Sequence, residues 1–175
     1  MTAPACATVK VRSRFWRMLA PRWAHKPLSG AGAAKHGGRY SPIGVPALYM
    51  SQDFATAVAE YEQDLGIRPG ILCAYEVHAR AVVDLTDPGV RAALGFTEAD
   101  LAAPWKTVWL VRRERPGTWN LAVRLIEMGV LGIRAPSVRA RGDNLVLWRW
   151  NEGPECRVEA LDPLPDLPRD QRSWR

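Results

Sequence analysis

Six polar residues of the chain have types that together could bind and act on a phosphate-bearing ligand. They are Arg17, Arg39, Tyr49, Ser51, Glu60 and Ser137. An arginine guanidinium presents a planar fork of donors that matches two phosphate oxygens at once. Each residue also has an ordinary structural explanation, such as an arginine after a Gly-Gly turn, a glutamate on the solvated side of a helix, or a serine in a turn after proline. The hypothesis of a site therefore depends on all six taken together.

Common catalytic signatures are absent from the sequence. It contains no G-x-S-x-G, no P-loop, no H-E-x-x-H and no G-x-G-x-x-G after a strand. The run Gly30-Ala31-Gly32 is too weak for a dinucleotide-binding motif, because no helix-forming pattern follows it. No tetrahedral metal signature can be assembled from the widely spaced Cys6, Cys73, Cys156, His25, His36 and His78. We therefore expect no metal site and no hydrolase, metalloprotease or Rossmann enzyme.

Positive charge is concentrated at the N-terminal end. The chain carries 24 Lys and Arg against 18 Asp and Glu, a net charge of +6. The first acidic residue is Asp53, and before it lie Lys10, Arg12, Arg14, Arg17, Arg22, Lys26, Lys35 and Arg39. A basic segment without acids indicates an anionic partner, which can be a nucleic acid, a membrane surface or a phosphate-bearing small molecule.

The length of 175 residues is that of a single domain. No stretch approaches the roughly 20 apolar residues of a membrane span, and the unpaired cysteines favour a reducing, cytoplasmic compartment. We expect a loose leader over residues 1–12, a domain over residues 13–162 and a tail over residues 163–175. The acid-poor leader would also suit an organelle transit peptide, but the strand-like run at residues 15–19 favours the start of a folded domain.

The elements that must position these residues follow from hydrophobic spacing. Alternation over residues 13–19 predicts a strand that carries Arg17. Repeated glycines and prolines in residues 20–46 predict a long loop that carries Arg39. A short strand over residues 47–50 follows.

A helix is expected to carry Glu60. Ser51 can act as its N-cap, and Gly66 ends it after Leu65. Its apolar residues follow i, i+4, i+7 and i+11 and form one face, which consists of Phe54, Val58, Tyr61 and Leu65. Glu60 lies about 120° from the centre of that face, so we expect its side chain to point to the side of the helix and not into the core.

The rest of the chain alternates between strands and helices. Strands are expected over residues 71–78, 81–85, 133–135, 145–150 and 157–161. Helices are expected over residues 97–103, where Thr97 and Asp100 form a capping box, and over residues 118–128, before Gly129. The mixture predicts an α+β fold.

Five short motifs contain the six polar residues. They are Phe15-Trp16-Arg17, Gly37-Gly38-Arg39-Tyr40-Ser41-Pro42-Ile43-Gly44, Leu48-Tyr49-Met50-Ser51, Ala57-Val58-Ala59-Glu60 and Ala135-Pro136-Ser137. In this order and spacing they resemble the RES domain family of bacterial toxins. The Arg, Glu and Ser that give the family its name correspond to Arg39, Glu60 and Ser137. The resemblance covers residues 13–162 and implies a fold related to ADP-ribosyltransferases, with twisted strands and a few short helices.

The resemblance implies an enzyme that cleaves the nicotinamide–ribose bond of NAD+, which is its substrate, without a metal. Nicotinamide leaves as a neutral molecule, so no general acid is needed and one carboxylate suffices. Glu60 would stabilise the oxocarbenium-like transition state through its charge and a hydrogen bond to a ribose hydroxyl. Arg39 and Tyr49 complete the implied catalytic group.

The other implied roles concern the binding of NAD+. Arg17 and Arg39 would bind the pyrophosphate, with the basic, glycine-rich segment lining that side. Tyr49 would stack on the cationic nicotinamide ring. Ser51 and Ser137 would bind the carboxamide or the ribose.

The resemblance also implies partners. RES toxins act with antitoxins that typically carry a helix-turn-helix DNA-binding region and block the active site. A homodimer and a protein acceptor are compatible with this assignment, and we expect no membrane contact and no direct contact with nucleic acid.

Two departures from the family pattern concern the acceptor of ADP-ribose. Tyr40-Ser41 stands where the family usually has Trp-Asn, and no Asn-Pro-x-His-Pro-like stretch follows Asn144. These departures favour transfer to a protein over phosphorolysis or hydrolysis, which deplete NAD+. A more distant alternative is a basic nucleic-acid-binding domain with Phe15, Trp16 and Trp23 as stacking surfaces.

Overall fold

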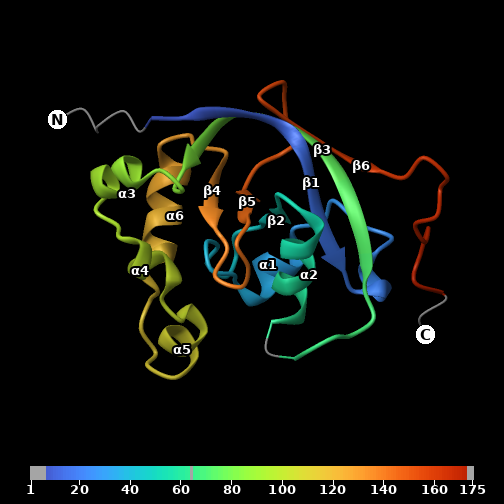
Figure 1. Ribbon diagram of the computed structural model, residues 1–175, viewed down its shortest axis with the longest axis horizontal. Coiled ribbons are helices and arrows are strands. Elements are labelled where there is room, and N and C mark those ends of the chain that lie inside the picture. The colour runs from blue at the N-terminus through green and yellow to red at the C-terminus, as the bar shows by residue number, and fades with distance from the viewer. Residues whose placement is uncertain (1–6, 64, 173–175) are drawn as a thin grey trace.

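The computed structural model describes residues 7–63 and 65–172 (Figure 1). Its six-stranded sheet consists of β1 (Val9–Leu19), β2 (Leu48–Ser51), β3 (Ile71–Asp84), β4 (Gly132–Pro136), β5 (Asp143–Leu147) and β6 (Cys156–Leu161). The helices are α1 (Ala31–His36), α2 (Phe54–Glu62), α3 (Pro88–Leu94), α4 (Glu98–Ala102), α5 (Trp105–Leu110) and α6 (Gly117–Glu127), with a 3-10 turn, η1, at Pro21–Trp23. The prediction of an α+β fold is confirmed.

Five of the six strands close into a ring, and β6 joins it through β3. The order of all six is β1-β2-β5-β4-β3-β6, and β1 also pairs with β3. The β1–β3 ladder is antiparallel and long, with Phe15 opposite Tyr75. In contrast, β1 and β2 share a single pair, Trp16 and Ser51. The ring is therefore firmly joined on one side of β1 and barely joined on the other.

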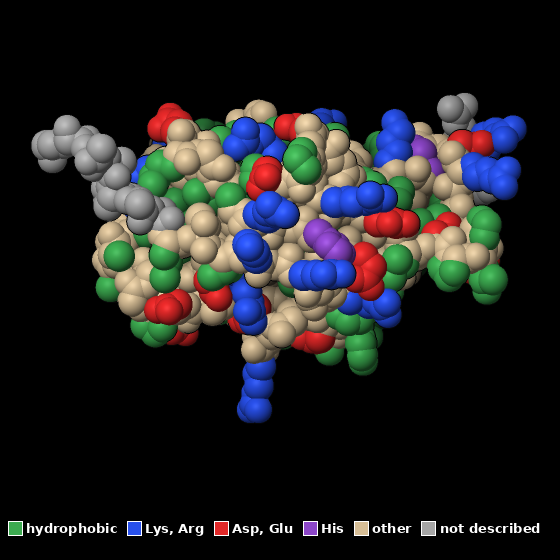
Figure 2. All heavy atoms as spheres, turned by 90° about the horizontal axis from the view of Figure 1, so that it is seen from above, with side chains coloured by type: hydrophobic (Ala, Val, Ile, Leu, Met, Phe, Trp, Pro, Cys, Tyr) green, Lys and Arg blue, Asp and Glu red, His purple; other side chains and the backbone are tan. Residues whose placement is uncertain are grey.

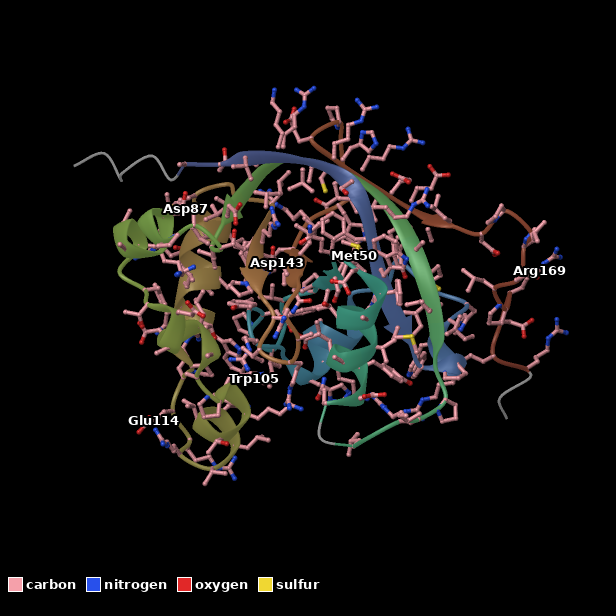
Figure 3. The ribbon with its side chains drawn as sticks, viewed as in Figure 1. Met50, Asp87, Trp105, Glu114, Asp143 and Arg169 are labelled. Atoms are coloured by element: carbon pink, nitrogen blue, oxygen red, sulfur yellow. The ribbon has the colours of Figure 1, made fainter. Side chains whose placement is uncertain are left out.

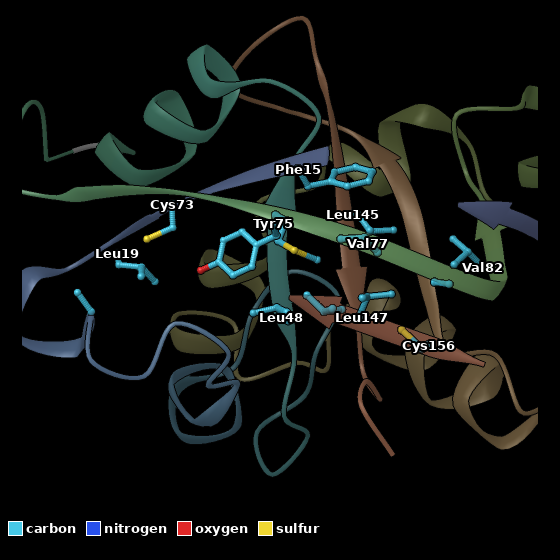
Figure 4. Packing of buried hydrophobic residues seen from close by; sticks show 14 residues of the cluster. Phe15, Leu19, Leu48, Cys73, Tyr75, Val77, Val82, Leu145, Leu147 and Cys156 are labelled. Atoms are coloured by element: carbon cyan, nitrogen blue, oxygen red, sulfur yellow. The ribbon is translucent and has the colours of Figure 1, made fainter. Parts of the chain in front are cut away.

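Apolar side chains fill the inside of the ring (Figure 4). Strand alternation brings Phe15, Leu48, Tyr75, Leu145 and Leu147 to this inner face, where all five are buried. Burying a side chain of this size stabilises the fold by about 1.5–3 kcal/mol. The inner cluster thus holds β1, β2, β3 and β5 together independently of the polar side chains on the outer face.

A second apolar cluster lies on the outer face of β4 and β5, under α6. Ile133 and Val146 of the sheet pack with Leu121 and Leu125 of the helix, and all four are buried. The amphipathic spacing of α6 explains its position, since its apolar residues fall on one side. The prediction of this helix is confirmed to within one residue at each end.

The chain between β3 and β4 forms a lobe of helices, on the left in Figure 1. Trp105 and Trp109 of α5 pack on Trp119 of α6, with ring centroids 6.1 and 4.9 Å apart. Figure 3 shows Glu114 at the tip of this lobe and Arg169 on the opposite side of the molecule. Helices α3 and α5 were not expected from the sequence, because both are short.

Several strand boundaries differ from those expected. Strand β1 begins at Val9, so Val9, Val11 and Arg12 of the expected leader pair with β3. Residues 71–84 form one strand and not two, because β1 and β6 both pair with Ala79 across the expected break. Strand β5 ends at Leu147 and not at residue 150.

Two local predictions in the helices had different outcomes. Helix α1 lies within the expected loop and directly follows Gly30. The expectation that no helix accompanies the run Gly30-Ala31-Gly32 was therefore wrong. The capping box at the start of α4 is confirmed, with Thr97 and Asp100 bonding to each other's backbone N–H.

Helix α2 begins later and ends earlier than expected. Its N-cap is Asp53, whose carboxylate accepts from the backbone N–H of Thr56 at 2.8 Å. Ser51 is not the cap, because it belongs to β2 and pairs with Asn144 of β5. The helix ends at Glu62.

The expected apolar face of α2 is also wrong. Phe54 is 60% exposed and Leu65 is 73% exposed, whereas Thr56 and Ala57 are buried. Glu60 follows these two residues by about one turn and therefore lies on the inner side of the helix. Hydrophobic spacing failed here because this side of α2 covers a polar cleft and not the apolar core.

No helix within residues 7–63 and 65–172 is long and apolar enough to cross a membrane. In the same part of the chain, no group of three or more His, Cys, Asp or Glu residues could hold a metal ion. Cys73 and Cys156 are buried free thiols, and Cys6 lies outside the described residues.

Candidate active site

A cleft of about 190 Å³ opens where β1 and β2 separate. It is lined by Trp16, Arg17, Met18, Tyr49, Met50, Ser51, Ala57, Glu60, Tyr61, Gln63, Arg68 and Asn144. Met50, near the centre of the molecule in Figure 3, belongs to the inner core. The next residue of the strand, Ser51, therefore takes the outer face. The cleft therefore lies at the edge of the ring, between β1 and β2. It brings together Arg17, Tyr49, Ser51 and Glu60, four of the predicted site residues.

Glu60 is anchored through one carboxylate oxygen. Its Oε1 accepts from Ser137 Oγ at 2.7 Å and from Asn144 Nδ2 at 2.6 Å. Because both of these neutral donors meet at Oε1, neither of them occupies Oε2. The two bonds fix the plane and direction of the carboxylate, and Glu60 lines the cleft in this orientation.

Ser137 is connected to the site through its hydrogen bond to Glu60. In the turn after β4, its Oγ accepts from the backbone N–H groups of Arg139 at 3.0 Å and Ala140 at 3.1 Å. The N–H of Ser137 donates to the carbonyl of Gly142 at 2.9 Å and closes the turn. Because the hydroxyl oxygen already accepts two bonds, its proton is directed to the carboxylate. Ser137 does not line the cleft itself, and its predicted contact with the ligand stays a prediction.

Asn144 is a site residue that the sequence reasoning did not select. It lies in β5, opposite Ser51 of β2 and Ala135 of β4. Its Oδ1 accepts from Ser51 Oγ at 2.7 Å, while its Nδ2 donates to Glu60. The available signal was alternation, since Asn144 and Val146 share a face of the strand and Asn144 is the polar one.

Tyr49 supports the turn over residues 38–41. Its hydroxyl accepts from the N–H of Tyr40 at 3.0 Å and bonds with Ser41 Oγ at 2.8 Å. Burial raises the pKa of Tyr49 to about 12, so the phenol stays neutral near pH 7. Gly38 is required beside it, because a Cβ at this position would collide with the Tyr49 hydroxyl. With the hydroxyl engaged, Tyr49 can offer its ring to the cleft.

Two cations line the cleft, Arg17 and Arg68. Arg17 Nη1 donates to the carbonyls of Pro27 at 3.4 Å and Ser29 at 3.3 Å. Burial lowers the pKa of Arg17, but an arginine remains charged at neutral pH. Arg68 lies over the ring of Tyr61, 3.9 Å from its centroid. Both guanidinium groups can attract an anionic ligand to the cleft.

Arg39 lies beside the cleft and does not line it. Its Nη1 donates to the carbonyls of Leu101 at 2.8 Å and Ala103 at 2.5 Å, at the end of α4. Burial lowers the pKa of Arg39, and the nearby Tyr40 and Glu60 partly oppose this effect. Arg39 therefore joins the site to the helical lobe and contributes positive charge near Glu60.

Most of the early cations lie outside the cleft. Lys10, Arg12 and Arg14 are exposed along β1, and Figure 2 shows Lys and Arg side chains gathered on this side of the molecule. Arg14 is paired with Glu76 at 2.9 Å. The expectation that the basic segment lines the phosphate side is wrong for these residues, because they lie on β1 before Trp16, the residue at which β1 meets β2 and the cleft.

Comparison with known proteins agrees with this architecture. The family model described as RES domain matches residues 14–170. Among solved structures, a chain of the M. tuberculosis MbcT–MbcA toxin–antitoxin complex is similar, with a TM-score of 0.63 and 21% identity over 91% of this chain and 89% of that chain. At this identity the structural likeness shows the fold alone. Comparison with curated proteins gave no match.

Proposed function

The chain belongs to the RES domain family and has its ADP-ribosyltransferase-like fold, and on this basis we propose that it is a toxin that cleaves the nicotinamide–ribose bond of NAD+. The observation that carries the proposal is the anchored Glu60 carboxylate in a cleft that also contains Arg17 and Tyr49. The carboxylate can stabilise the charge that develops during the cleavage, the cation can bind the phosphates, and the aromatic ring can stack on nicotinamide.

Glu60 acts on the charge that develops at the ribose. As the bond to nicotinamide breaks, C1 of the ribose becomes electron-poor, and a fixed carboxylate nearby stabilises it. Oε2 accepts a hydrogen bond from a ribose hydroxyl, while Oε1 keeps its hydrogen bonds from Ser137 and Asn144. The carboxylate does not have to reorganise during the reaction, because both neutral donors already hold it.

The remaining groups orient NAD+ in the cleft. The ring of Tyr49 receives the cationic nicotinamide, a contact worth roughly 0.5–2 kcal/mol. Arg17 binds the pyrophosphate through donors other than Nη1. Arg39 contributes through its positive charge beside Glu60, and Ser51 fixes the cleft wall through Asn144. No metal takes part in this scheme.

The nucleophile that attacks C1 defines the reaction. We propose transfer of ADP-ribose to a protein as the first candidate, with attack by phosphate or water as the alternative. All three require the same donor site and differ in the space beside C1.

The proposed partner is an antitoxin. The similar solved chain comes from a toxin–antitoxin complex, and a toxin of this kind needs a protein that covers the cleft until the toxin is released. A cytoplasmic location, where NAD+ is available, follows from the same proposal.

The experiment that tests the function is nicotinamide release from NAD+ by the purified protein, in phosphate-free buffer, with phosphate, and with cell extract. Release that depends on extract, with label from NAD+ moving to protein, indicates a transferase. Release that depends on phosphate indicates a phosphorylase, and release in buffer alone indicates a glycohydrolase. No release under any condition would reject the NAD+ assignment, and salt-dependent binding of DNA or RNA would then support the nucleic-acid alternative.

Glu60→Gln is the decisive variant. The amide keeps the size of the side chain but removes the charge, so turnover should fall about 10²–10³-fold with little change in unfolding temperature. Glu62→Gln is the matched control, because Glu62 lies on the same helix and does not line the cleft. Equal turnover in Glu60→Gln and Glu62→Gln would remove Glu60 from the reaction.

A further inference from the structure

We infer that Asn144 is a positioning residue that fixes the orientation of the Glu60 carboxylate, an inference that rests on the proposed function. Asn144 Nδ2 donates to Glu60 Oε1 at 2.6 Å, and both residues line the cleft. By holding Oε1, Asn144 sets the direction in which Oε2 meets the ribose.

The orientation of the Asn144 amide follows from the chemistry of its neighbours. A carboxylate only accepts hydrogen bonds, so the side of the amide that faces Glu60 must be Nδ2. Oδ1 then faces Ser51, whose hydroxyl donates to it at 2.7 Å. Glu60 therefore selects the orientation of the amide, because a flipped amide would place Oδ1 against the carboxylate and lose the bond to Glu60.

The two donors to Glu60 differ in the rigidity of their supports. Asn144 lies in β5, which is paired with β2 on one side and β4 on the other. Ser137 lies at the start of a turn that the Gly142 carbonyl closes. Sites are held more accurately by strands than by loops. Asn144 is therefore the donor that ties the carboxylate of α2 to the sheet.

The first test removes the donor. In Asn144→Ala, kcat for nicotinamide release should fall about 10- to 100-fold, the usual effect of losing a hydrogen bond to a charged group. The KM for NAD+ should change little, because in the proposed function the phosphates are bound by Arg17 and Asn144 acts through Glu60. Ser51→Ala should have a smaller effect in the same direction, since the bond to Glu60 is retained.

The second test replaces the donor with a group that donates only when protonated. In Asn144→Asp, two carboxylates face each other, so at neutral pH the donor is lost and like charges repel. At lower pH the pair shares one proton, and the protonated carboxyl group of the variant can donate to Glu60. The kcat of this variant relative to wild type should therefore increase as the pH falls.

The cations around this pair do not titrate in the same range. Arg17 and Arg68 line the cleft and Arg39 lies near Glu60, and arginines stay charged throughout. Asn120→Asp, on the exposed side of α6, is the control for the added charge and should follow the wild-type profile.

A third measurement does not depend on activity. The side-chain amide signals of Asn144 in a ¹⁵N-resolved NMR spectrum should shift in Glu60→Ala and stay unchanged in Glu62→Ala. Loss of turnover in Glu60→Gln with full turnover in Asn144→Ala would overturn the inference and leave the proposed function intact. A pH-independent loss in Asn144→Asp would also overturn it. If the wild type releases no nicotinamide, the proposed function fails and the positioning role fails with it, while the amide signals still report whether the contact exists.

Discussion

Strands β2 and β5 use alternate residues for opposite purposes. The inner face carries Leu48, Met50, Leu145 and Leu147, which pack in the apolar core. The outer face carries Tyr49, Ser51, Asn144 and Val146, of which the first three line the cleft. The inner face is held by apolar packing. On the outer face, Ser51 and Asn144 are held by a hydrogen bond to each other, whereas Val146 packs in the second apolar cluster.

The difference shows how the core and the site depend on each other. Shifting a strand by one residue exchanges its two faces, so burying four large apolar side chains also fixes the outward residues. The pairs Met50–Leu145 and Ser51–Asn144 are adjacent in the β2–β5 ladder. The core therefore sets the register that brings Ser51 and Asn144 within hydrogen-bond distance, and the site contributes little to the register itself.

The largest expected effect on stability comes from truncating a buried side chain of the inner face. Leu145→Ala removes a fully buried side chain and should lower the free energy of unfolding by about 2–5 kcal/mol in urea denaturation. The folded fraction should keep near wild-type kcat, because Leu145 points away from the cleft. Leu164→Ala, at a side chain that is 76% exposed, is the control and should change stability by less than about 0.5 kcal/mol. A large loss of kcat in folded Leu145→Ala would contradict the separation of the two faces.

An intermediate effect is expected from crowding the outer face. In Gly38→Ala the new Cβ collides with the Tyr49 hydroxyl and Ser41 Oγ, so stability should fall by about 1–3 kcal/mol and turnover should fall with it. Thermal unfolding and nicotinamide release measure both effects.

Gly32→Ala is the matched control for this change. Gly32 lies inside α1 and has open space where a Cβ would stand. Alanine is the better helix former by about 0.5–1 kcal/mol, so this variant should be more stable and equally active. A change in stability of the same sign in both glycine variants would mean that the collision with Tyr49 does not determine the effect of Gly38→Ala.

The sequence predicts well what depends on local spacing. Helix α6, the capping box at Thr97 and the strand containing Tyr49 follow from patterns of a few neighbouring residues. The family resemblance indicated both Glu60 and Ser137, which are 77 positions apart in the sequence. In the structure Ser137 Oγ lies 2.7 Å from Glu60 Oε1.

The features that escaped prediction depend on contacts between distant segments. Glu60 was expected on the side of its helix, because an apolar pattern cannot reveal that a helix covers a polar cleft. Asn144 was not selected, because its partners lie 84 and 93 residues away in the sequence. Arg39 was expected at the phosphates, whereas its Nη1 bonds to the carbonyls that end α4, a helix encoded about 60 residues later.

The smallest expected effect is a change in stability at Tyr49, and its pH dependence reports how strongly the outer face is shielded from water. Tyr49→Phe removes the acceptor for the Tyr40 N–H and should cost about 1 kcal/mol of stability at pH 8. In the unfolded chain a tyrosine ionises near pH 10, whereas burial raises the pKa of Tyr49 to about 12 in the folded protein. Between these values the unfolded wild type gains from ionisation and the folded wild type does not, so wild-type stability falls by up to about 1.4 kcal/mol per pH unit from this group. The variant lacks this loss. Urea unfolding from pH 8 to 11.5 should therefore show the stability advantage of the wild type over the variant disappearing within about one unit above pH 10. Parallel curves would mean that Tyr49 is as accessible to water as an unfolded tyrosine, and the outer face would then be an open surface and not a site closed around its hydrogen bonds.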